Sequence, residues 1–322
     1  MKLLTEVAQP GPFVTLEPES HVVLSGSCFA EHIGRRLAEA LPEGHVCGCP
    51  RGVLYNPASL LAEAEGLLTD GDSGRRWFEG SEGMWHDWDY ASAYSAPSRA
   101  ALAAMLAERE AAAKAVWQRA ALWVVTFSTD HAYFLRHAVA GDVDALPVAN
   151  CHKQPSALFE ERVLPYGQME QQWGGLLERL RQTRPGLKVV FTLSPYRYAK
   201  YGLHESQLSK ARLLLLIDSL CGRYADVAAY FPAYEIVHDE LRDYRFYAPD
   251  MLHPSEQAVH YVWERFCRWA FSERLSAYAR EKAAIVRDAA HRMLHPDSPA
   301  AQAFRSAARE RRRAFETKWG SL

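Results

Sequence analysis

The sequence has 322 residues, 48% hydrophobic and 24% charged, enough for one large domain with extensions or two small domains. Its 37 basic and 39 acidic residues give a net charge of -2, so no broad basic surface for nucleic acid is expected. No apolar run approaches the roughly 18 residues that span a bilayer, and residues 1–6 lack the apolar stretch of a secretory signal. We therefore expect a cytoplasmic protein with neither a membrane nor a nucleic-acid partner.

Strands and helices alternate along the chain. Short apolar runs predict strands, and apolar residues at helical spacing predict helices. The first expected elements are strand 21–26, helices 31–41 and 57–68, a Gly- and Trp-rich loop over 70–95, helix 98–120 and strand 122–127. After an irregular stretch to about residue 164 come helix 165–183, strand 188–193, helix 205–223, a weaker strand over 226–231, helix 255–272 and a heavily charged helical segment over 273–318.

This alternation predicts an α/β fold in three layers, with a central parallel sheet between two layers of helices. The boundary is expected at residue 272, where a charged helical C-terminal extension over 273–322 begins. Parallel sheets bind ligands beyond the carboxyl ends of their strands. Three polar segments fall there, namely Gly26-Ser27-Cys28, Ser128-Thr129-Asp130 and Ser194-Pro195-Tyr196-Arg197.

The segment Gly26-Ser27-Cys28 joins the first strand to the helix that follows. A side chain at a helix start lies among free backbone N–H groups at the positive end of the helix dipole. This position is expected to lower the pKa of the Cys28 thiol and to supply oxyanion donors. The structural alternative makes Ser27 an N-cap and Cys28 a buried spacer.

Asp250 and His253 form a second candidate pair. A carboxylate three residues before a histidine can accept a hydrogen bond from Nδ1 and leave Nε2 as the base. The spacing alone is weak, because Asp288 and His291 repeat it within a charged helix, which we interpret as a solvated face.

Five further polar residues are candidates for substrate or oxyanion contacts. Asn150, His152 and Lys153 could form a substrate-binding edge, although neighbouring Cys and His residues are more often incidental. Asn56 could place an amide donor near the first loop or serve as a turn residue. Arg197 could pair with an anionic group of a substrate or form a surface ion pair.

Gly-Ser-Cys-Phe-Ala, at 26–30, is the pentapeptide that names the GSCFA family, and the resemblance extends beyond it. Blocks similar to those of the family follow in order at 51–57, 148–153, 194–197, 209–210, 230–235 and 250–254. Together they cover about residues 1–270, and the last fifty residues fall outside the resemblance.

The GSCFA family is placed among SGNH-hydrolase-type folds, which resemble flavodoxin in strand order. The resemblance implies a nucleophile after the first strand, a late Asp-x-x-His pair and oxyanion donors from two middle loops. Asp250 and His253 match the late pair. SGNH enzymes usually carry Gly-Asp-Ser in the first block, so the third position is Cys28 here, and we favour it over Ser27 as nucleophile.

The usual Gly-x-Asn block of these enzymes is not matched here. Ser128 stands where related sequences often have glycine, and Asn56 or Asn150 is taken as the replacement donor. The function expected from the resemblance and the residues is acyl transfer or ester cleavage through a covalent acyl-enzyme, with transfer slightly favoured. No cofactor is required, acyl-CoA is a candidate donor, and a small molecule or saccharide is the expected acceptor.

Two other functions remain open from the sequence. The fold could serve as a binding or assembly module without turnover, with the charged extension as its interaction element. A metal hydrolase using His86, Cys151 and His152 is a weaker alternative, because their spacing matches no standard metal site.

Overall fold

The computed structural model describes residues 5–69, 75–136, 147–295 and 297–320. Outside these residues lie 1–4 of the expected first domain, 70–74 of the expected loop, 137–146 of the irregular stretch, and 296 and 321–322 of the expected C-terminal extension. Within the described ranges, no helix is both long and apolar enough to cross a membrane.

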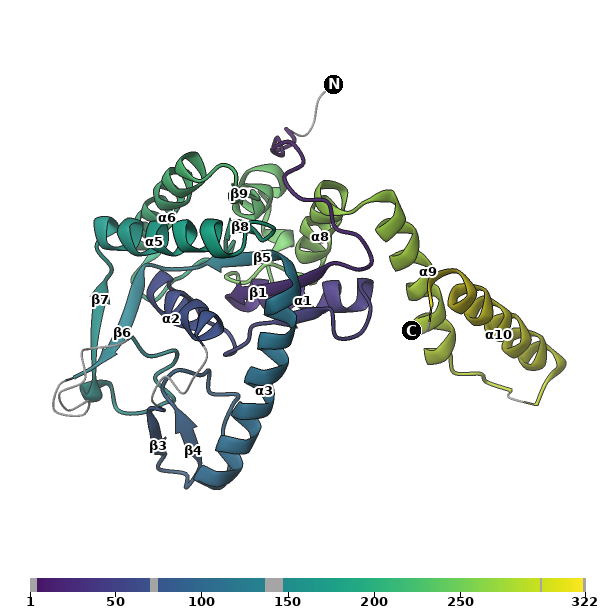
Figure 1. The fold of residues 1–322 in the computed structure, drawn as a ribbon, viewed down its shortest axis with the longest axis horizontal. Coiled ribbons are helices and arrows are strands. Elements are labelled where there is room, and N and C mark those ends of the chain that lie inside the picture. The colour runs from purple at the N-terminus through teal and green to yellow at the C-terminus, as the bar shows by residue number, and fades with distance from the viewer. Residues whose placement is uncertain (1–4, 70–74, 137–146, 296, 321–322) are drawn as a thin grey trace.

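A five-stranded parallel sheet forms the centre of the molecule (Figure 1). Its strands are β1 (His21–Gly26), β2 (Val46–Gly48), β5 (Ala120–Phe127), β8 (Lys188–Leu193) and β9 (Ala228–Tyr230), in the spatial order β2-β1-β5-β8-β9. Counted along the chain within this sheet, the order is 2-1-3-4-5, which is that of flavodoxin-like folds. The predicted α/β class and strand order are therefore confirmed.

Helices cover both faces of the sheet because its central strands are apolar on both sides. In β5, Trp123 and Val125 belong to one buried cluster, whereas Leu122 and Val124 belong to the other. The first cluster packs against α2 (Pro57–Leu68), α3 (Arg99–Arg119), α5 (Tyr166–Thr183) and α6 (Leu203–Arg223). The second packs against α1 (Cys28–Ala40) and α8 (Glu256–Ala270).

Several short elements lie where the sequence predicts loops. Two small antiparallel sheets pair β3 (Trp77–Glu79) with β4 (Trp85–Asp87) and β6 (His131–Leu135) with β7 (Phe159–Val163). Strands of three to five residues show too little periodicity to be recognised from sequence. The remaining short elements are 3-10 turns at Ser156–Leu158 and Tyr244–Phe246, α7 (Ala233–Glu235) and a π-helical turn at Ile236–Leu241.

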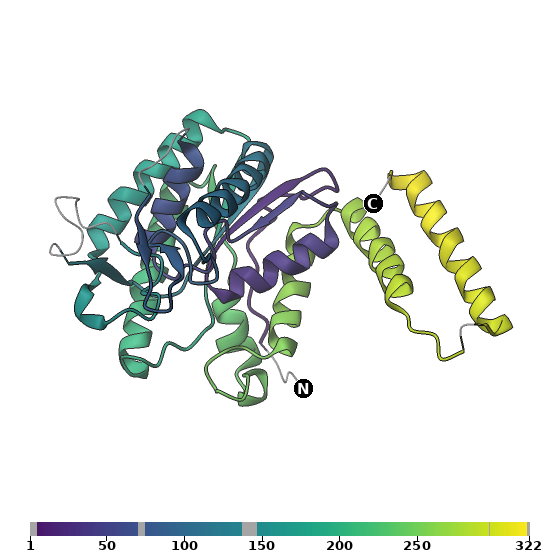
Figure 2. The same cartoon turned by 90° about the horizontal axis from the view of Figure 1, so that it is seen from below.

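The C-terminal segment is a helical hairpin that projects from the α/β body (Figures 1 and 2). The segment 273–318 is helical as predicted and consists of two helices, because α9 (Glu273–Ala290) ends before α10 (Pro299–Trp319) begins. Arg311 Nε on α10 lies 2.7 Å from Asp288 Oδ2 on α9. Asp288 therefore joins the two helices through an exposed ion pair.

Candidate functional site

A pocket of about 420 Å³ lies beyond the carboxyl ends of the central strands. Its walls come from the turn after β1, the segment before α2, the segment after β5, residues 148–151 and the loops around 196–198 and 253. Of the residues expected from sequence, the pocket lining includes Ser27, Cys28, Asn56, Asn150 and His253. His152, Lys153 and Arg197 are not in that lining.

Cys28 is the first residue of α1 and is half-buried at the pocket wall. Burial raises the pKa of its thiol, while the backbone N–H of Phe29 acts in the opposite direction. The lowered pKa expected from the helix start is therefore wrong. The N–H groups are placed as predicted, but desolvation by the surrounding pocket outweighs them. At neutral pH Cys28 is a thiol and requires a base to become a nucleophile.

Ser27 occupies the N-cap position of α1, but its side chain makes no capping hydrogen bond. Its Oγ is buried and, among the described atoms, has no hydrogen-bond partner. Ser27 is therefore an N-cap by position, as the structural alternative has it, but it lacks the side-chain hydrogen bond that a serine cap usually makes.

His253 is held by Asp250 within one short loop. Asp250 Oδ2 lies 2.5 Å from His253 Nδ1, and Oδ1 accepts the backbone N–H groups of Leu252 and His253 at 2.9 and 3.0 Å. These bonds, led by the backbone N–H of His253, lower the pKa of Asp250 to about 2. Asp250 is therefore a carboxylate at neutral pH and accepts the Nδ1 proton, which leaves Nε2 as the basic atom.

Arg197 and Tyr196 support the loop that carries His253. Arg197 donates its backbone N–H to Leu252 O at 3.0 Å and its Nη1 to Met251 O at 3.2 Å. The Tyr196 ring lies 4.4 Å from the His253 ring, centroid to centroid. The hydrogen bonds of Arg197 are thus directed at the loop, and neither a substrate anion nor a surface ion pair is needed to explain this residue.

The two asparagines of the pocket share one arrangement. Asn56 Oδ1 accepts the backbone N–H of Ser59 at 2.9 Å, and this bond caps α2. Asn150 Oδ1 accepts the backbone N–H of His152 at 2.8 Å. Because each oxygen is already used, the amide Nδ2 is the group that each residue can offer as a donor to a ligand.

His152 lies beside the pocket in a buried cluster with Phe78, His86 and Trp88. Burial lowers its pKa to about 4, so the ring is neutral at pH 7. Lys153 is exposed. In the described part of the chain, no group of three or more His, Cys, Asp or Glu side chains could hold a metal ion, so the metal-hydrolase alternative lacks a ligand set.

The sequence reasoning missed most of the aromatic wall of the pocket. Tyr55, Tyr133, Tyr196 and Tyr198 all line it, as does His131. Tyr55 directly precedes Asn56, and Tyr196 lies in a segment already singled out. Their position next to candidate residues in the sequence could have identified these two tyrosines as pocket residues. Nothing in the sequence around Tyr133 indicates that it lines this pocket.

The fold and the pocket define an α/β protein of flavodoxin strand order, with a cysteine and an Asp–His pair beyond the carboxyl ends of its strands. The sequence profile of the GSCFA family matches residues 21–266. The chain therefore belongs to the GSCFA family, as the motifs indicated. Comparison with curated proteins gives no match.

Proposed function

We propose that this protein is an acyl-handling enzyme, an acyltransferase or ester or thioester hydrolase that forms an acyl-enzyme on Cys28. The observation that carries the proposal is that Cys28 and the Asp250-oriented His253 line the same pocket. A second pocket, of about 440 Å³, has no cysteine, serine or histidine among its lining residues. A larger pocket, of about 680 Å³, contains Cys47 and His21, but burial raises the pKa of Cys47 to about 11, and Nδ1 of His21 pairs with the backbone oxygen of Glu19 and not with a carboxylate.

Cys28 is favoured over Ser27 as the nucleophile. Cys28 is half-buried at the pocket wall, whereas Ser27 is 1% exposed and its Oγ is inaccessible. A thiol of raised pKa fits a mechanism in which His253 Nε2 removes the proton as Sγ attacks the acyl carbonyl. The protonated imidazole then gives this proton to the leaving group, and Asp250 keeps the ring oriented in both steps.

The developing oxyanion is assigned to backbone and amide donors. The N–H groups at the start of α1 face the Cys28 sulfur, and Asn56 and Asn150 each have an amide nitrogen to offer.

The lining also narrows the class of substrate. Among its described residues there is no Lys, Arg, Asp or Glu side chain, and four tyrosine rings contribute to the wall. We propose a neutral acyl group and a neutral small-molecule or saccharide acceptor, because a charged group would lose its hydration without gaining a partner. Acyl-CoA stays a candidate donor whose phosphates would have to lie outside this pocket.

A thioester intermediate passes its acyl group readily to an acceptor, which favours transfer over hydrolysis. The chemistry needs no cofactor. All six cysteines are free thiols, and we propose a cytoplasmic location, where thiols stay reduced.

The test is intact-mass spectrometry after brief exposure to activated esters and acyl thioesters. Wild type is expected to gain the mass of one acyl group, and Cys28→Ala is expected to lose that gain. Cys151→Ala is the matched control, because Cys151 is another half-buried thiol in the same pocket. This variant should label like wild type.

Other outcomes separate the alternatives. An adduct that survives in Cys28→Ala and maps to Ser27 would keep the mechanism and reverse the choice of atom. An adduct lost only in Cys151→Ala would move the chemistry to that thiol. No adduct with any reagent would count against the enzyme and in favour of a binding module built on the same fold.

A further inference from the structure

A row of aromatic rings extends along the pocket from His253. The Tyr196 ring lies 4.4 Å from the His253 ring, and the Tyr198 ring lies 6.0 Å from that of Tyr196, measured between centroids. Tyr201 follows at 5.4 Å from Tyr198 and stacks on His131 at 4.0 Å. All of these residues except Tyr201 line the pocket. The pocket wall therefore continues beyond His253, through Tyr196, to Tyr198 and His131.

Hydrogen bonds and ion pairs fix the far end of this row. Tyr133 also lines the pocket, and its hydroxyl bonds with Lys200 Nζ and, at 3.1 Å, with the Tyr201 hydroxyl. Lys200 Nζ lies 3.2 Å from Glu161 Oε2, and Glu161 Oε1 lies 3.6 Å from His131 Nδ1. With the stacking of Tyr201 on His131, these contacts form a closed ring of five side chains. The ring joins β6 and β7 to the loop after β8, so this part of the wall is fixed before a ligand binds.

Tyr198 differs from Tyr133 in the state of its hydroxyl group. Within the described residues, the Tyr198 hydroxyl forms no hydrogen bond with the protein, and it is not fully buried. Burial of the side chain raises its pKa to about 12, so at neutral pH it is a hydroxyl that can both donate and accept a hydrogen bond. Tyr198 can therefore offer a ligand an apolar ring face and a polar edge.

These groups suit a neutral ligand that carries several hydroxyls. Because the described lining holds no Lys, Arg, Asp or Glu side chain, a charged ligand would gain no ion pair there. An apolar acyl chain would cover the Tyr198 hydroxyl without giving it a partner, which costs free energy. A sugar ring has C–H groups that can lie against a tyrosine ring and hydroxyls that can bond with its edge. This end of the pocket therefore matches the acceptor better than the acyl group.

We propose that Tyr198, with Tyr133 and His131 forming the wall beside it, is the subsite for a saccharide acceptor, and that its hydroxyl binds one hydroxyl of the sugar. The inference rests on the proposed acyl transfer from Cys28. It goes further by naming the class of acceptor and the residue that selects it.

The transfer step follows from this placement. A second hydroxyl of the sugar attacks the thioester carbonyl, and its proton passes to His253 Nε2. The C–S bond then breaks, the sugar ester leaves, and the Cys28 sulfur regains a proton from the imidazole. Tyr198 holds the sugar and takes no part in the proton transfer.

The test separates use of the acceptor from acylation. Enzyme that carries an acyl group on Cys28 is mixed with methyl glucoside, galactose, N-acetylglucosamine or 1-propanol. Intact-mass spectrometry follows the loss of the adduct, and the mass of the acylated product identifies the acceptor. We expect wild type to acylate at least one of these sugars, with a rate that saturates as the sugar concentration rises.

Tyr198→Phe keeps the ring and its packing but removes the hydroxyl. The variant should gain the acyl group at Cys28 within about twofold of the wild-type rate, because the Tyr196 ring lies between Tyr198 and His253. Its KM for the sugar should rise about tenfold, as expected for the loss of one neutral hydrogen bond. Transfer to 1-propanol, which has no second hydroxyl, should be unchanged. Tyr244→Phe is the matched control, because Tyr244 is 65% exposed and lies outside the lining.

An equal KM for the sugar in wild type and Tyr198→Phe would overturn the inference. Slower acylation of Tyr198→Phe with an unchanged KM would also overturn it and would assign Tyr198 to the acyl donor. Saturation-transfer NMR with the same sugars measures binding without acyl transfer. Sugar binding that is lost in Tyr198→Phe, without acyl adducts on wild type, would reject the proposed function alone. Acyl adducts without sugar binding or transfer would reject the saccharide subsite alone.

Discussion

The Asp250–His253 pair is the part of the site that depends most on a single hydrogen bond. Asp250→Asn keeps the shape of the side chain but removes the charge that holds the Nδ1 proton. We expect acyl-adduct formation to slow about 100-fold or more, because His253 then loses its orientation and much of its strength as a base. The measurement is the rate of mass gain with the acyl donor that labels wild type best.

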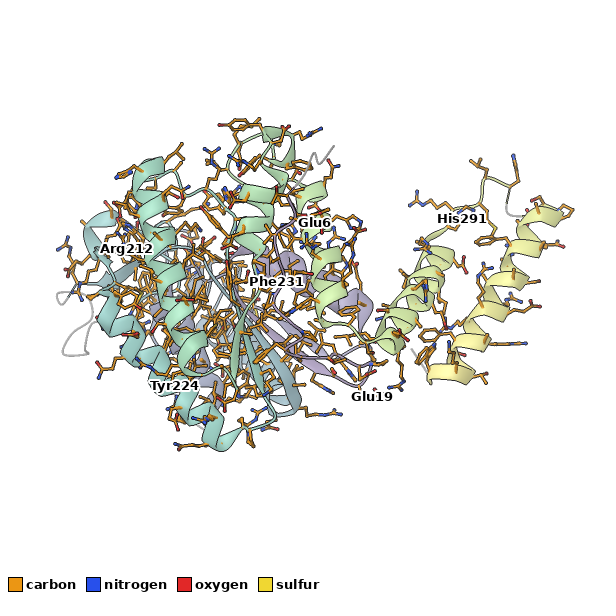
Figure 3. All side chains as sticks on the ribbon, turned by 90° about the horizontal axis from the view of Figure 1, so that it is seen from above. Glu6, Glu19, Arg212, Tyr224, Phe231 and His291 are labelled. Carbon is orange, nitrogen blue, oxygen red and sulfur yellow. The ribbon has the colours of Figure 1, made fainter. Side chains whose placement is uncertain are left out.

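The chain supplies a control with the same sequence spacing. Asp288 stands three residues before His291 but pairs with Arg311, and His291 lies in the projecting hairpin, well away from Arg212 on α6 (Figure 3). Asp288→Asn should leave the rate of labelling unchanged. An equal loss in both aspartate variants would mean that the effect does not arise at the pocket.

Lys210, a buried residue of α6 whose Nζ donates to Ser128 O and Ser194 O, predicts a dependence of stability on pH. Its pKa is about 7 in the folded protein against an ordinary 10.5, so the unfolded chain binds more protons between these values. The free energy of unfolding contributed by this group therefore rises with pH from about 7 to 10.5, by at most about 1.4 kcal/mol per unit.

Lys210→Met should remove that rise. Urea unfolding of both proteins at several pH values measures it, and the quantity to compare is the difference between wild type and variant, because tyrosines and cysteines also titrate at high pH. A difference that stays constant from pH 7 to 10 would show that Lys210 does not change its protonation state in this range.

At the scale of single residues, the sequence predicts which residues form the site better than it predicts the burial and pKa of their side chains. Cys28, Asp250 and His253 were found because each lies in a short motif at a strand or helix end. The pKa of Cys28 was predicted in the wrong direction, because it depends on burial by segments distant in sequence. The same reason hides Tyr133, which reaches the pocket only through the pairing of β6 with β7.

At the scale of elements, the backbones of β1 and β5 approach each other closely where β1 ends, next to the site. Gly26 pairs with Thr126 and has a φ of 143°. A Cβ there would lie 2.5 Å from Thr126 O. Gly26→Ala should therefore lower the free energy of unfolding by about 2–4 kcal/mol in urea titration.

Gly175→Ala provides the contrast, because Gly175 lies inside α5 with nothing within 4 Å of an added Cβ. It should raise stability by about 0.5–1 kcal/mol through helix propensity. If Gly26→Ala were as stable as Gly175→Ala, the ends of β1 and β5 would be able to move apart. The contact between them would then not fix the turn before Cys28.

Helices longer than ten residues and the three longer strands of the sheet, β1, β5 and β8, were predictable, because each repeats its apolar period several times. The break between α9 and α10 was missed, although a signal for it was present. Ser298 accepts the backbone N–H of Ala301 at 3.2 Å, and Pro299 is the first residue of α10. Serine followed by proline is typical of a helix start, but the helix-forming residues around it concealed the boundary.

At the scale of the whole molecule, the packing shows which of the C-terminal helices belong to the stably folded α/β domain. The charge pattern placed the boundary at residue 272, yet α9 packs against the body: Leu275 is fully buried, and Lys282 donates to the carbonyls at the end of α1. In contrast, Phe315 and Trp319 of α10 pack on Tyr278 of α9. The packing therefore ties α9 to the body and α10 to α9.

Two shortened chains test this arrangement by urea unfolding and by acyl labelling of Cys28. A chain ending at residue 290 removes α10 and should label within about twofold of the full chain. A chain ending at 272 also removes α9 and should lose about 2–5 kcal/mol, because Leu275 and Ile285 no longer cover apolar surface on the body. If the chain ending at 272 were as stable as the full chain, the boundary drawn from charge would be right. If the chain ending at 290 lost labelling, α10 would contribute to the site from outside the body.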